Sequence, residues 1–381
     1  MHPSPELAIA RGAARLFFAA SNESLMQLAV DSYRSIGALG DGPELLDLAW
    51  TSDEQERLAI DLRLLVAEEL RAEAGNGLDF LSRYLVQDPY AERLLAGPVG
   101  RFFGLGGPPP AVTAGAGVGS LLAAAAGLAG SRPVQILGSV YPDFPAWVER
   151  TGGRVAEGQR PGLIFLERPQ LTGSWQPSRA EIGALCRAAP DAIVVIDESN
   201  ANYCPPEESL VPAVSEWPNL LILRGFSKAY QMGGLRLGYC VSQAPMAEAL
   251  RHRLPPLLAS SLSLRIGIAI LEQGDICVAL RQAIAAALTR AKALFAGAGW
   301  APDRAAHPAL PYLLFDSANE ARIAAIEARG IRGKRHAGWQ AGVGATSTYR
   351  ISVPLVPARM EALQRRLAGT SSGSPVAGRN A

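Results

Sequence analysis

The fold is decided by residues 192–241, which read AIVVIDESNANYCPPEESLVPAVSEWPNLLILRGFSKAYQMGGLRLGYCV. Three short apolar runs stand in this stretch, at 192–197, 220–224 and 237–241. Runs of this length that are apolar at consecutive positions, rather than at alternate ones, are typical of strands covered on both faces. We therefore predict three buried strands of one sheet.

The same pattern continues towards the N-terminus. Apolar runs at 134–137 and 162–166 predict two further strands, and the stretches 178–189 and 207–217 predict helices between strands. Strands that alternate with helices form a mostly parallel, doubly wound α/β sheet.

A second, smaller α/β unit is predicted towards the C-terminus. It follows a long helical region at 243–295, and its strands are expected near 311–315 and 348–353. The small-residue tail at 369–381 is predicted to be disordered.

The N-terminal segment is predicted to be helical, first at 1–20 and again at 52–74. Ser52 and Gln55 form a capping-box pattern at the start of the second helix, which has an apolar face. The stretch 28–75 is rich in acidic residues, and we interpret it as an insertion with a solvated acidic face.

Charge and composition argue against several classes of protein. The chain has 36 Lys and Arg against 35 Asp and Glu, so no basic excess is available for nucleic-acid phosphates. The four cysteines form no CxxC pair and the four histidines no HxxH or HxxxH pair, so we expect no metal site. The uncharged stretch 106–131 contains three prolines and several glycines, which favours a loop that opens a core helix over a membrane span. With no clear secretory signal, we expect a cytoplasmic protein.

Asp197 and Lys228 are the residues that suggest chemistry. Asp197 ends one predicted strand, and Lys228 follows the next strand after Gly225-Phe226-Ser227. Because ligands of parallel sheets bind at the carboxyl ends of the strands, the two side chains are expected at one rim. An amine and a carboxylate placed together there suit a pyridine cofactor with an aldehyde, whose carbonyl joins the amine while the acid protonates the ring nitrogen.

The stretch Val194–Tyr239 resembles the core of the class I/II pyridoxal-phosphate aminotransferases of fold type I, and most closely the histidinol-phosphate aminotransferase branch. The block that carries the resemblance is SKAYQMGGLRLGY, in which Arg236 stands eight residues after Lys228. A looser similarity runs from about Asn22 to residue 367. The resemblance implies a large domain with a mostly parallel seven-stranded sheet and a smaller α/β C-terminal domain. The implied boundaries are an N-terminal segment at 1–83, a cofactor-binding domain at 84–262, a small domain at 263–368 and a tail at 369–381.

The resemblance also implies that pyridoxal 5'-phosphate is the cofactor. Lys228 would be the Schiff-base lysine and proton shuttle, and Asp197 would pair with the pyridine nitrogen. Ser227 and Arg236 would hold the phosphate together with the backbone N–H groups of the glycine-rich loop Ala116, Gly117 and Val118. Glycines ahead of a helix N-terminus form an anion cradle in many proteins, which supports this last assignment independently.

Further roles follow from the resemblance alone. Tyr141 would stack on the cofactor ring, and Arg350 would grip the substrate carboxylate with two parallel hydrogen bonds. Tyr84 would contact the cofactor phosphate bound in the other subunit, which implies a homodimer with a shared active site. Asn22, in Asn22-Glu23-Ser24, resembles the family's N-terminal substrate-binding motif.

The chain departs from the family pattern at three positions beside the expected cofactor. Gln170 stands where an asparagine usually bonds the phenolic oxygen, Asn200 stands where a tyrosine is usual, and Gly225 replaces a hydroxyl residue. A lost phenol is expected to alter proton transfer around the ring.

Three functions remain open at this point. The first is an aminotransferase acting on an L-amino acid or a related amine. The second is a pyridoxal-phosphate lyase, cyclase or oxidase of specialised metabolism, acting on an activated amino acid such as S-adenosylmethionine or on arginine, and it is motivated by the three departures. The third is a non-catalytic pyridoxal-phosphate-binding regulator, which the acidic N-terminal segment makes least favourable.

Overall fold

The structure is a computed structural model. The residues that it describes are 45–107, 110–172, 176–340 and 342–369. The helix expected at 1–20, the predicted substrate residue Asn22 and the tail from residue 370 onward lie outside the described residues.

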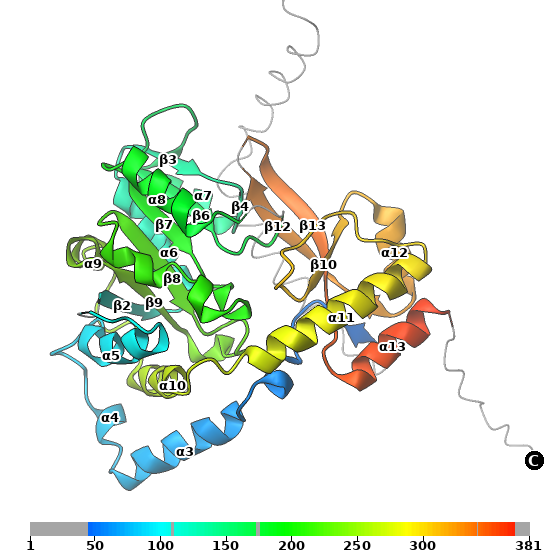
Figure 1. The fold of residues 1–381 in the computed structure, drawn as a ribbon, viewed down its shortest axis with the longest axis horizontal. Helices are drawn as coiled ribbons and strands as arrows, with labels where there is room; N and C mark the ends of the chain where they lie inside the picture. Colours follow the sequence, from blue (N-terminus) through cyan, green and yellow to red (C-terminus); the bar gives the residue numbers. More distant parts are fainter. Residues whose placement is uncertain (1–44, 108–109, 173–175, 341, 370–381) are drawn as a thin grey trace, which may run out of the picture.

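A seven-stranded sheet forms the centre of the larger unit (Figure 1). Its strands in spatial order are β2 (Ala111–Ala116), β9 (Leu237–Ser242), β8 (Leu220–Gly225), β7 (Ile193–Asp197), β6 (Leu163–Glu167), β3 (Pro133–Ile136) and β5 (Arg154–Val155). Strand β9 is antiparallel to both β2 and β8, and the other neighbouring pairs are parallel. The predicted mostly parallel sheet of seven strands is confirmed.

Helices cover both faces of this sheet. One face packs against α6 (Val118–Ala126), α7 (Asp143–Arg150) and α9 (Ala244–Arg251). The other face packs against α5 (Glu92–Phe102), α8 (Arg179–Ala188) and α10 (Ser261–Glu272). In β7, Val194 and Ile196 lie in one core and Val195 lies in the other, and all three are fully buried. Burial on both faces explains why the strand is apolar at consecutive positions.

The smaller unit is built on a four-stranded antiparallel sheet. Its strands in spatial order are β10 (Tyr312–Asp316), β13 (Gly344–Ser352), β12 (Lys334–Gln340) and β4 (Ser139–Val140). Its helices are α11 (Val278–Gly297), α12 (Glu320–Ala328) and α13 (Pro357–Leu367). The two predicted strands of this unit are confirmed. Strand β4 belongs by sequence to the larger unit, and it joins the two units by pairing with the end of β12.

The helix predicted at 207–217 is wrong. The chain forms only two short 3-10 turns there, η4 (Pro206–Glu208) and η5 (Val211–Ser215). Pro206 and Pro212 each stand near the start of one of these turns. A proline supplies no backbone N–H and restricts the residue before it, so a continuous helix does not pass through this region.

The predicted helix at 52–74 is also partly wrong. The chain forms the 3-10 turn η1 (Glu54–Arg57), and the helix α3 (Leu62–Gly75) begins only afterwards. Its N-cap is Asp61, whose side chain accepts hydrogen bonds from the backbone N–H groups of Arg63 and Leu64. Ser52 does not form the expected capping box, because tertiary contacts hold the chain around it in a different path.

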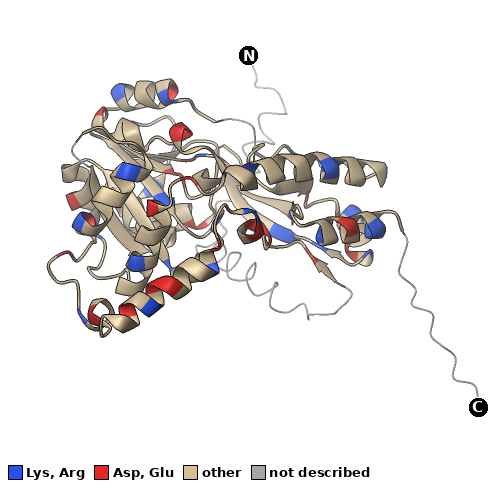
Figure 2. Ribbon diagram, turned by 60° about the horizontal axis from the view of Figure 1, so that its bottom comes forward, with Lys and Arg blue, Asp and Glu red and all other residues tan. Residues whose placement is uncertain are grey.

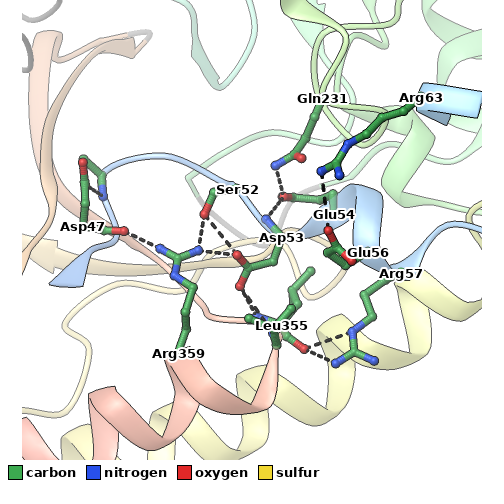
Figure 3. Close-up of polar contacts among 12 residues, drawn as sticks. Asp47, Ser52, Asp53, Glu54, Glu56, Arg57, Arg63, Gln231, Leu355 and Arg359 are labelled. Carbon is green, nitrogen blue, oxygen red and sulfur yellow. Dashed lines mark hydrogen bonds and ion pairs between the residues drawn. The ribbon is translucent and has the colours of Figure 1, made fainter. Parts of the chain in front are cut away.

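Residues 46–57, which we call the bridging segment, connect the two units (Figure 3). Strand β1 (Leu46–Asp47) pairs in parallel with β11 (Ile331–Arg332) of the smaller unit. The Asp53 carboxylate accepts a hydrogen bond from the Leu355 N–H at 2.9 Å and forms an ion pair with Arg359. On the other side, the Gln231 amide of the larger unit donates to Glu54 at 2.6 Å. The segment therefore fastens one unit to the other.

The expectation of a solvated acidic face on this part of the chain needs correction, because Asp53, Glu54 and Glu73 are buried. Glu73 in α3 accepts hydrogen bonds from the N–H groups of Phe80 and Leu81, at the short helix α4 (Asp79–Ser82), and lies 3.6 Å from Arg265 of α10. These partners compensate the desolvation that would otherwise keep a carboxylate at the surface. The rest of α3 carries exposed acidic and basic side chains, and both kinds are interspersed over the ribbon (Figure 2).

Glu54 provides a testable consequence of this burial. Burial raises the pKa of the Glu54 carboxyl from 4.5 to about 7, although Tyr203 and other hydrogen-bond donors oppose the shift. The folded state therefore binds more protons than the unfolded state between these two values, and the free energy of unfolding should fall as the pH rises through this window. One proton accounts for at most about 1.4 kcal/mol per pH unit. In the Glu54→Gln variant, urea unfolding measured from about pH 5 to pH 7 should show a shallower decline.

The control for this prediction is Glu56→Gln, two residues further along the same 3-10 turn η1. Its side chain is 60% exposed and faces Arg63, so the decline should stay as in the parent chain. Equal slopes for the parent and the Glu54→Gln protein would contradict the prediction.

The uncharged stretch 106–131 forms, in its described part, strand β2 and helix α6 of the large unit. The expected core helix is confirmed as α6, whereas residues 111–116, expected in a glycine-rich loop, form strand β2 of the sheet. Over the whole described part of the chain, we find no helix that combines the length and the apolar character needed to cross a membrane.

Candidate active site

A cavity of about 540 Å³ lies where the two units meet. The larger unit contributes the carboxyl ends of its parallel strands, including Glu167 of β6 and Asp197 of β7. The smaller unit contributes side chains of β12 and β13, and the bridging segment contributes Trp50 and Thr51. The cavity therefore stands at the rim where ligands of parallel sheets bind.

Asp197 and Lys228 both line this cavity, as predicted from the sequence. Asp197 is 4% exposed, and its Oδ1 accepts a hydrogen bond from the Ser199 N–H at 2.8 Å. Burial raises the pKa of this carboxyl above its ordinary value, although the hydrogen bonds from Ser199 and the charge of Lys228 oppose the shift.

Lys228 follows β8 and lines the cavity, to whose open space its side chain is exposed. Loss of hydration lowers the pKa of the Lys228 ammonium, and the charge of Arg350 lowers it further. The carboxyl groups of Asp197 and Glu167 act in the opposite direction. An amine whose pKa is lowered carries a free electron pair more often at neutral pH, so Lys228 is suited to act as a nucleophile and as a base.

The glycine-rich loop meets Arg236 at the start of α6. Gly117 has φ of +77° and precedes the helix, and no side chain caps the free N–H groups there. A Cβ atom on Gly117 would lie 2.6 Å from Arg236 Nη2. Arg236 itself donates to the Ala116 carbonyl at 3.2 Å. Helix N–H groups, a guanidinium and the nearby Ser227 hydroxyl form a donor set that fits a phosphate group.

Gly225, one of the departures from the family pattern, has a steric explanation. A Cβ atom at this position would lie 2.6 Å from Cγ2 of Val118, the first residue of α6. The hydroxyl side chain that is usual in the family would therefore collide with this helix. The cradle is built with Val118 in place of that hydroxyl.

Tyr141 and Asn200 line the cavity, in agreement with their predicted places. Tyr141 follows β4, and its ring centroid lies 6.0 Å from that of Trp147 in α7. Its backbone N–H donates a hydrogen bond to the Glu167 carboxylate. The backbone of Tyr141 is thus held by Glu167, and its ring contacts the ring of Trp147.

Gln170 is not placed among the cavity-lining residues, which departs from its predicted contact with a cofactor. Its amide accepts a hydrogen bond from the Ser139 N–H at 3.2 Å and donates to the Leu137 carbonyl at 3.3 Å. The side chain fits there because Gly138, with φ of +74°, has no Cβ atom; one would lie 2.2 Å from the Gln170 amide nitrogen. Glu167 at the end of β6 and the residues Leu171 and Thr172 after Gln170 do line the cavity, and sequence reasoning missed Glu167.

Arg350 lines the cavity from β13, as predicted. Its Nη2 donates to the Ala49 carbonyl at 3.1 Å, and its guanidinium stacks 4.4 Å from the Tyr312 ring centroid. The buried Nε has no hydrogen-bond partner among the described residues. The guanidinium is therefore held in place at the wall of the cavity by the Ala49 carbonyl and the Tyr312 ring.

Lys334 and His336 also face the cavity from β12, and the sequence analysis missed both. Lys334 pairs in register with Arg350, and its ammonium lies 4.5 Å from the Trp50 ring centroid. Burial, with smaller contributions from Arg350 and Lys228, lowers the pKa of Lys334 to about 7. No strand was predicted at these positions, so the sequence analysis had no signal that the two side chains share one face of β12.

Tyr84 lies outside the cavity of this chain, between α4 and α5, and its side chain is 82% exposed. Within one chain, Tyr84 therefore does not line the cavity that holds the other predicted site residues.

Comparison with known proteins gives the following matches. The model of the family described as aminotransferase class I and II matches residues 111–367, more than half of the chain. A histidinol-phosphate aminotransferase of Pyrococcus furiosus is 35% identical over 127 residues, which are 33% of this chain and 36% of that protein. One of Aromatoleum aromaticum is 28% identical over 288 residues, which are 68% of this chain and 76% of that protein.

The first of these alignments spans only about a third of the relative's length. A solved structure is similar over a longer part of the chain. It is the crystal structure of histidinol-phosphate aminotransferase from Sinorhizobium meliloti in complex with pyridoxal-5'-phosphate. The TM-score is 0.61 at 23% sequence identity, with 81% of this chain and 88% of that chain covered. At this identity the likeness shows a shared fold.

Proposed function

This chain belongs to the family of class I and II aminotransferases, and on that premise we propose that it is a pyridoxal-phosphate enzyme that transfers the amino group of an L-amino acid or a related amine. The family resemblance found in the sequence is confirmed, as is the fold expected from it. The observation that carries the proposal is the meeting of Lys228 and Asp197 in one cavity beside the glycine cradle at α6.

The residues around the cavity fit the cofactor. When bound, pyridoxal 5'-phosphate would supply an aldehyde that receives amino groups and a ring that withdraws electrons from the reacting carbon. Ser227, Arg236 and the N–H groups at the start of α6 would hold its phosphate. Tyr141 would lie against its ring, and Asn200 lines the same cavity as Asp197.

Two side chains of the protein would move or hold protons. The Lys228 amine would accept the proton from the α-carbon of the substrate and return it at the end of the transfer, a role that its lowered pKa supports. The Asp197 carboxylate would hold a proton on the ring nitrogen, and the positive charge of the protonated nitrogen would stabilise electron density that develops during the reaction.

Arg350 would bind the carboxylate of the substrate. Its guanidinium is fixed by Ala49 and Tyr312 at the wall of the cavity. We further propose a homodimer in which the exposed Tyr84 reaches the phosphate of the partner subunit, with a large domain at 84–262 and a small domain at 263–368. The high exposure of Tyr84 and the neighbouring Val86 supports this part of the proposal.

A single-turnover experiment tests the function. The cofactor-loaded enzyme is mixed with a panel of amino acids without any amino acceptor, and 2-oxo acid and ammonia are measured. An aminotransferase should release oxo acid in stoichiometric amount and retain the nitrogen on the cofactor. Release of ammonia, or no product with any amino acid of a broad panel, would refute amino transfer.

Arg350→Gln tests the substrate-carboxylate assignment. A hydrogen bond to a charged group contributes about 1.5–3 kcal/mol, so KM should rise about 10- to 100-fold while kcat changes less. Steady-state kinetics with the best donor from the panel measures both constants. Arg335→Gln is the matched control, because Arg335 lies on β12 with its side chain 48% exposed and paired with Glu320. An unchanged KM in the Arg350 variant would show that another group holds the carboxylate.

A further inference from the structure

Glu167 and Asp197 form a pair of neighbouring carboxyl groups in the wall of the cavity. Glu167 ends β6 and Asp197 ends β7, and the two are partners in the register of these parallel strands. Side chains of register partners point to the same face of a sheet. Both residues are buried, at 8% and 4% exposure, and both line the cavity.

The pair has little direct compensation for two negative charges. Glu167 accepts a hydrogen bond from the Tyr141 backbone N–H, and Asp197 accepts one from the Ser199 N–H. Among the residues that the structure describes, neither carboxyl group forms an ion pair with Lys, Arg or His. Lys228 is the cation that acts on both, through the cavity. Across the cavity stand Arg350, Lys334 and His336 of the smaller unit.

Two adjacent buried carboxylates do not ionise together, because each charge is poorly hydrated and repels the other. Burial, followed by the charge of Asp197, raises the pKa of the Glu167 carboxyl to about 8. Asp197 is better placed to carry the negative charge, since the Ser199 backbone N–H and hydroxyl both stabilise its ionised form. At neutral pH the shared proton therefore resides on Glu167.

We propose that Glu167 is a positioning acid that keeps one proton beside Asp197, so that the pair carries a single negative charge and thereby sets how strongly Asp197 holds a proton on the ring nitrogen of the cofactor. This role rests on the proposed function, in which Asp197 meets that nitrogen. With Glu167 neutral, one charge faces the ring. When Glu167 loses its proton, a second negative charge stands nearby and the ring nitrogen becomes more basic.

The first test uses the full chain without cofactor. Infrared difference spectra recorded across a pH titration follow the C=O stretch of protonated carboxyl groups. The wild type should lose one such band near pH 8, and Glu167→Gln should lack that band. Glu54→Gln is the matched control, because the pKa of the buried Glu54 is also raised, to about 7, and only the lower transition should vanish in that variant. A titration near pH 8 that persists in Glu167→Gln would overturn the proposal.

The second test uses the cofactor-loaded protein. Absorbance of the bound cofactor should show an inflection near pH 8 in the wild type. Glu167→Gln, which stays neutral, should lose this inflection, and Glu167→Asp should restore it. A merely structural glutamate would leave the inflection in place in all three proteins, and that result would overturn the proposal.

The two tests separate the role of Glu167 from the proposed function. If the cofactor joins Lys228 normally but the Glu167-dependent transitions are absent, the positioning role alone fails. If borohydride reduction leaves no cofactor on Lys228 of the wild type, the proposed function fails and this role fails with it, whatever the infrared titration shows.

Discussion

Replacing Lys228 with alanine is expected to reduce turnover by about three orders of magnitude, which lies within the contribution of a positioned proton-transfer group. The variant loses the amine that attaches the cofactor and also the base that moves the substrate proton. Two measurements check this. The first is kcat with the best amino donor, and the second is the mass of the Lys228 peptide after borohydride reduction in the presence of pyridoxal 5'-phosphate.

Lys292→Ala is the matched control for this prediction. Lys292 lies on α11 and is exposed, far in the sequence from the strand ends that line the cavity. Its removal should leave both the rate and the cofactor adduct unchanged. An adduct on a different lysine, or a Lys228→Ala protein with nearly normal turnover, would remove the basis of the proposed function.

Asp197→Asn should produce the second-largest loss. Asparagine keeps the shape and the hydrogen bond to Ser199, but it removes the charge that would hold a proton on the ring nitrogen. Breaking one side of a buried charge pair costs about 3–5 kcal/mol, and the lower part of this range, about 3–4 kcal/mol, corresponds to roughly two to three orders of magnitude in rate. Steady-state kinetics and equilibrium binding of the cofactor together show how the loss divides between turnover and affinity.

The control for this variant is Asp191→Asn, near the opposite end of strand β7. Asp191 precedes β7, is 64% exposed and pairs with Arg160. Asp191→Asn should change activity and stability little, within about 0.5 kcal/mol. If Asp197→Asn stays within a few-fold of the parent rate, the ring nitrogen does not depend on this carboxylate.

The strands of the large sheet were predictable because each is buried on both faces. Leu220 and Ile222 of β8 lie in one core, and Leu221 and Leu223 lie in the other, so the whole run is apolar. A continuous apolar run of this length is a local property that can be seen without knowledge of the partners. The same holds for Lys228 and Asp197, whose positions relative to the strand ends follow directly from the chain.

The path of the bridging segment could not be predicted in this way. Its acidic residues and the pattern at Ser52 and Gln55 favour a helix when only neighbours are considered. In the structure, Asp53 instead contacts Leu355 and Arg359, and Gln55 donates to the carbonyl of Tyr230. These partners stand far away in the sequence, and their hydrogen bonds outweigh a helical preference that is small for each residue.

By itself, the sequence determined five strands of the central sheet, the family and the positions of Lys228 and Asp197, because strand burial and a dense motif are encoded within short stretches, whereas strands β2 and β5 were not predicted. The tertiary structure alone decided that Gln170 turns to the backbone beside Gly138, that Glu167 stands next to Asp197, and that Lys334 and His336 face Lys228 from another sheet. Whether a side chain lines the cavity depends on which face of its strand borders the cavity and on which unit packs against that side. Both are set by packing between segments that lie far apart along the chain.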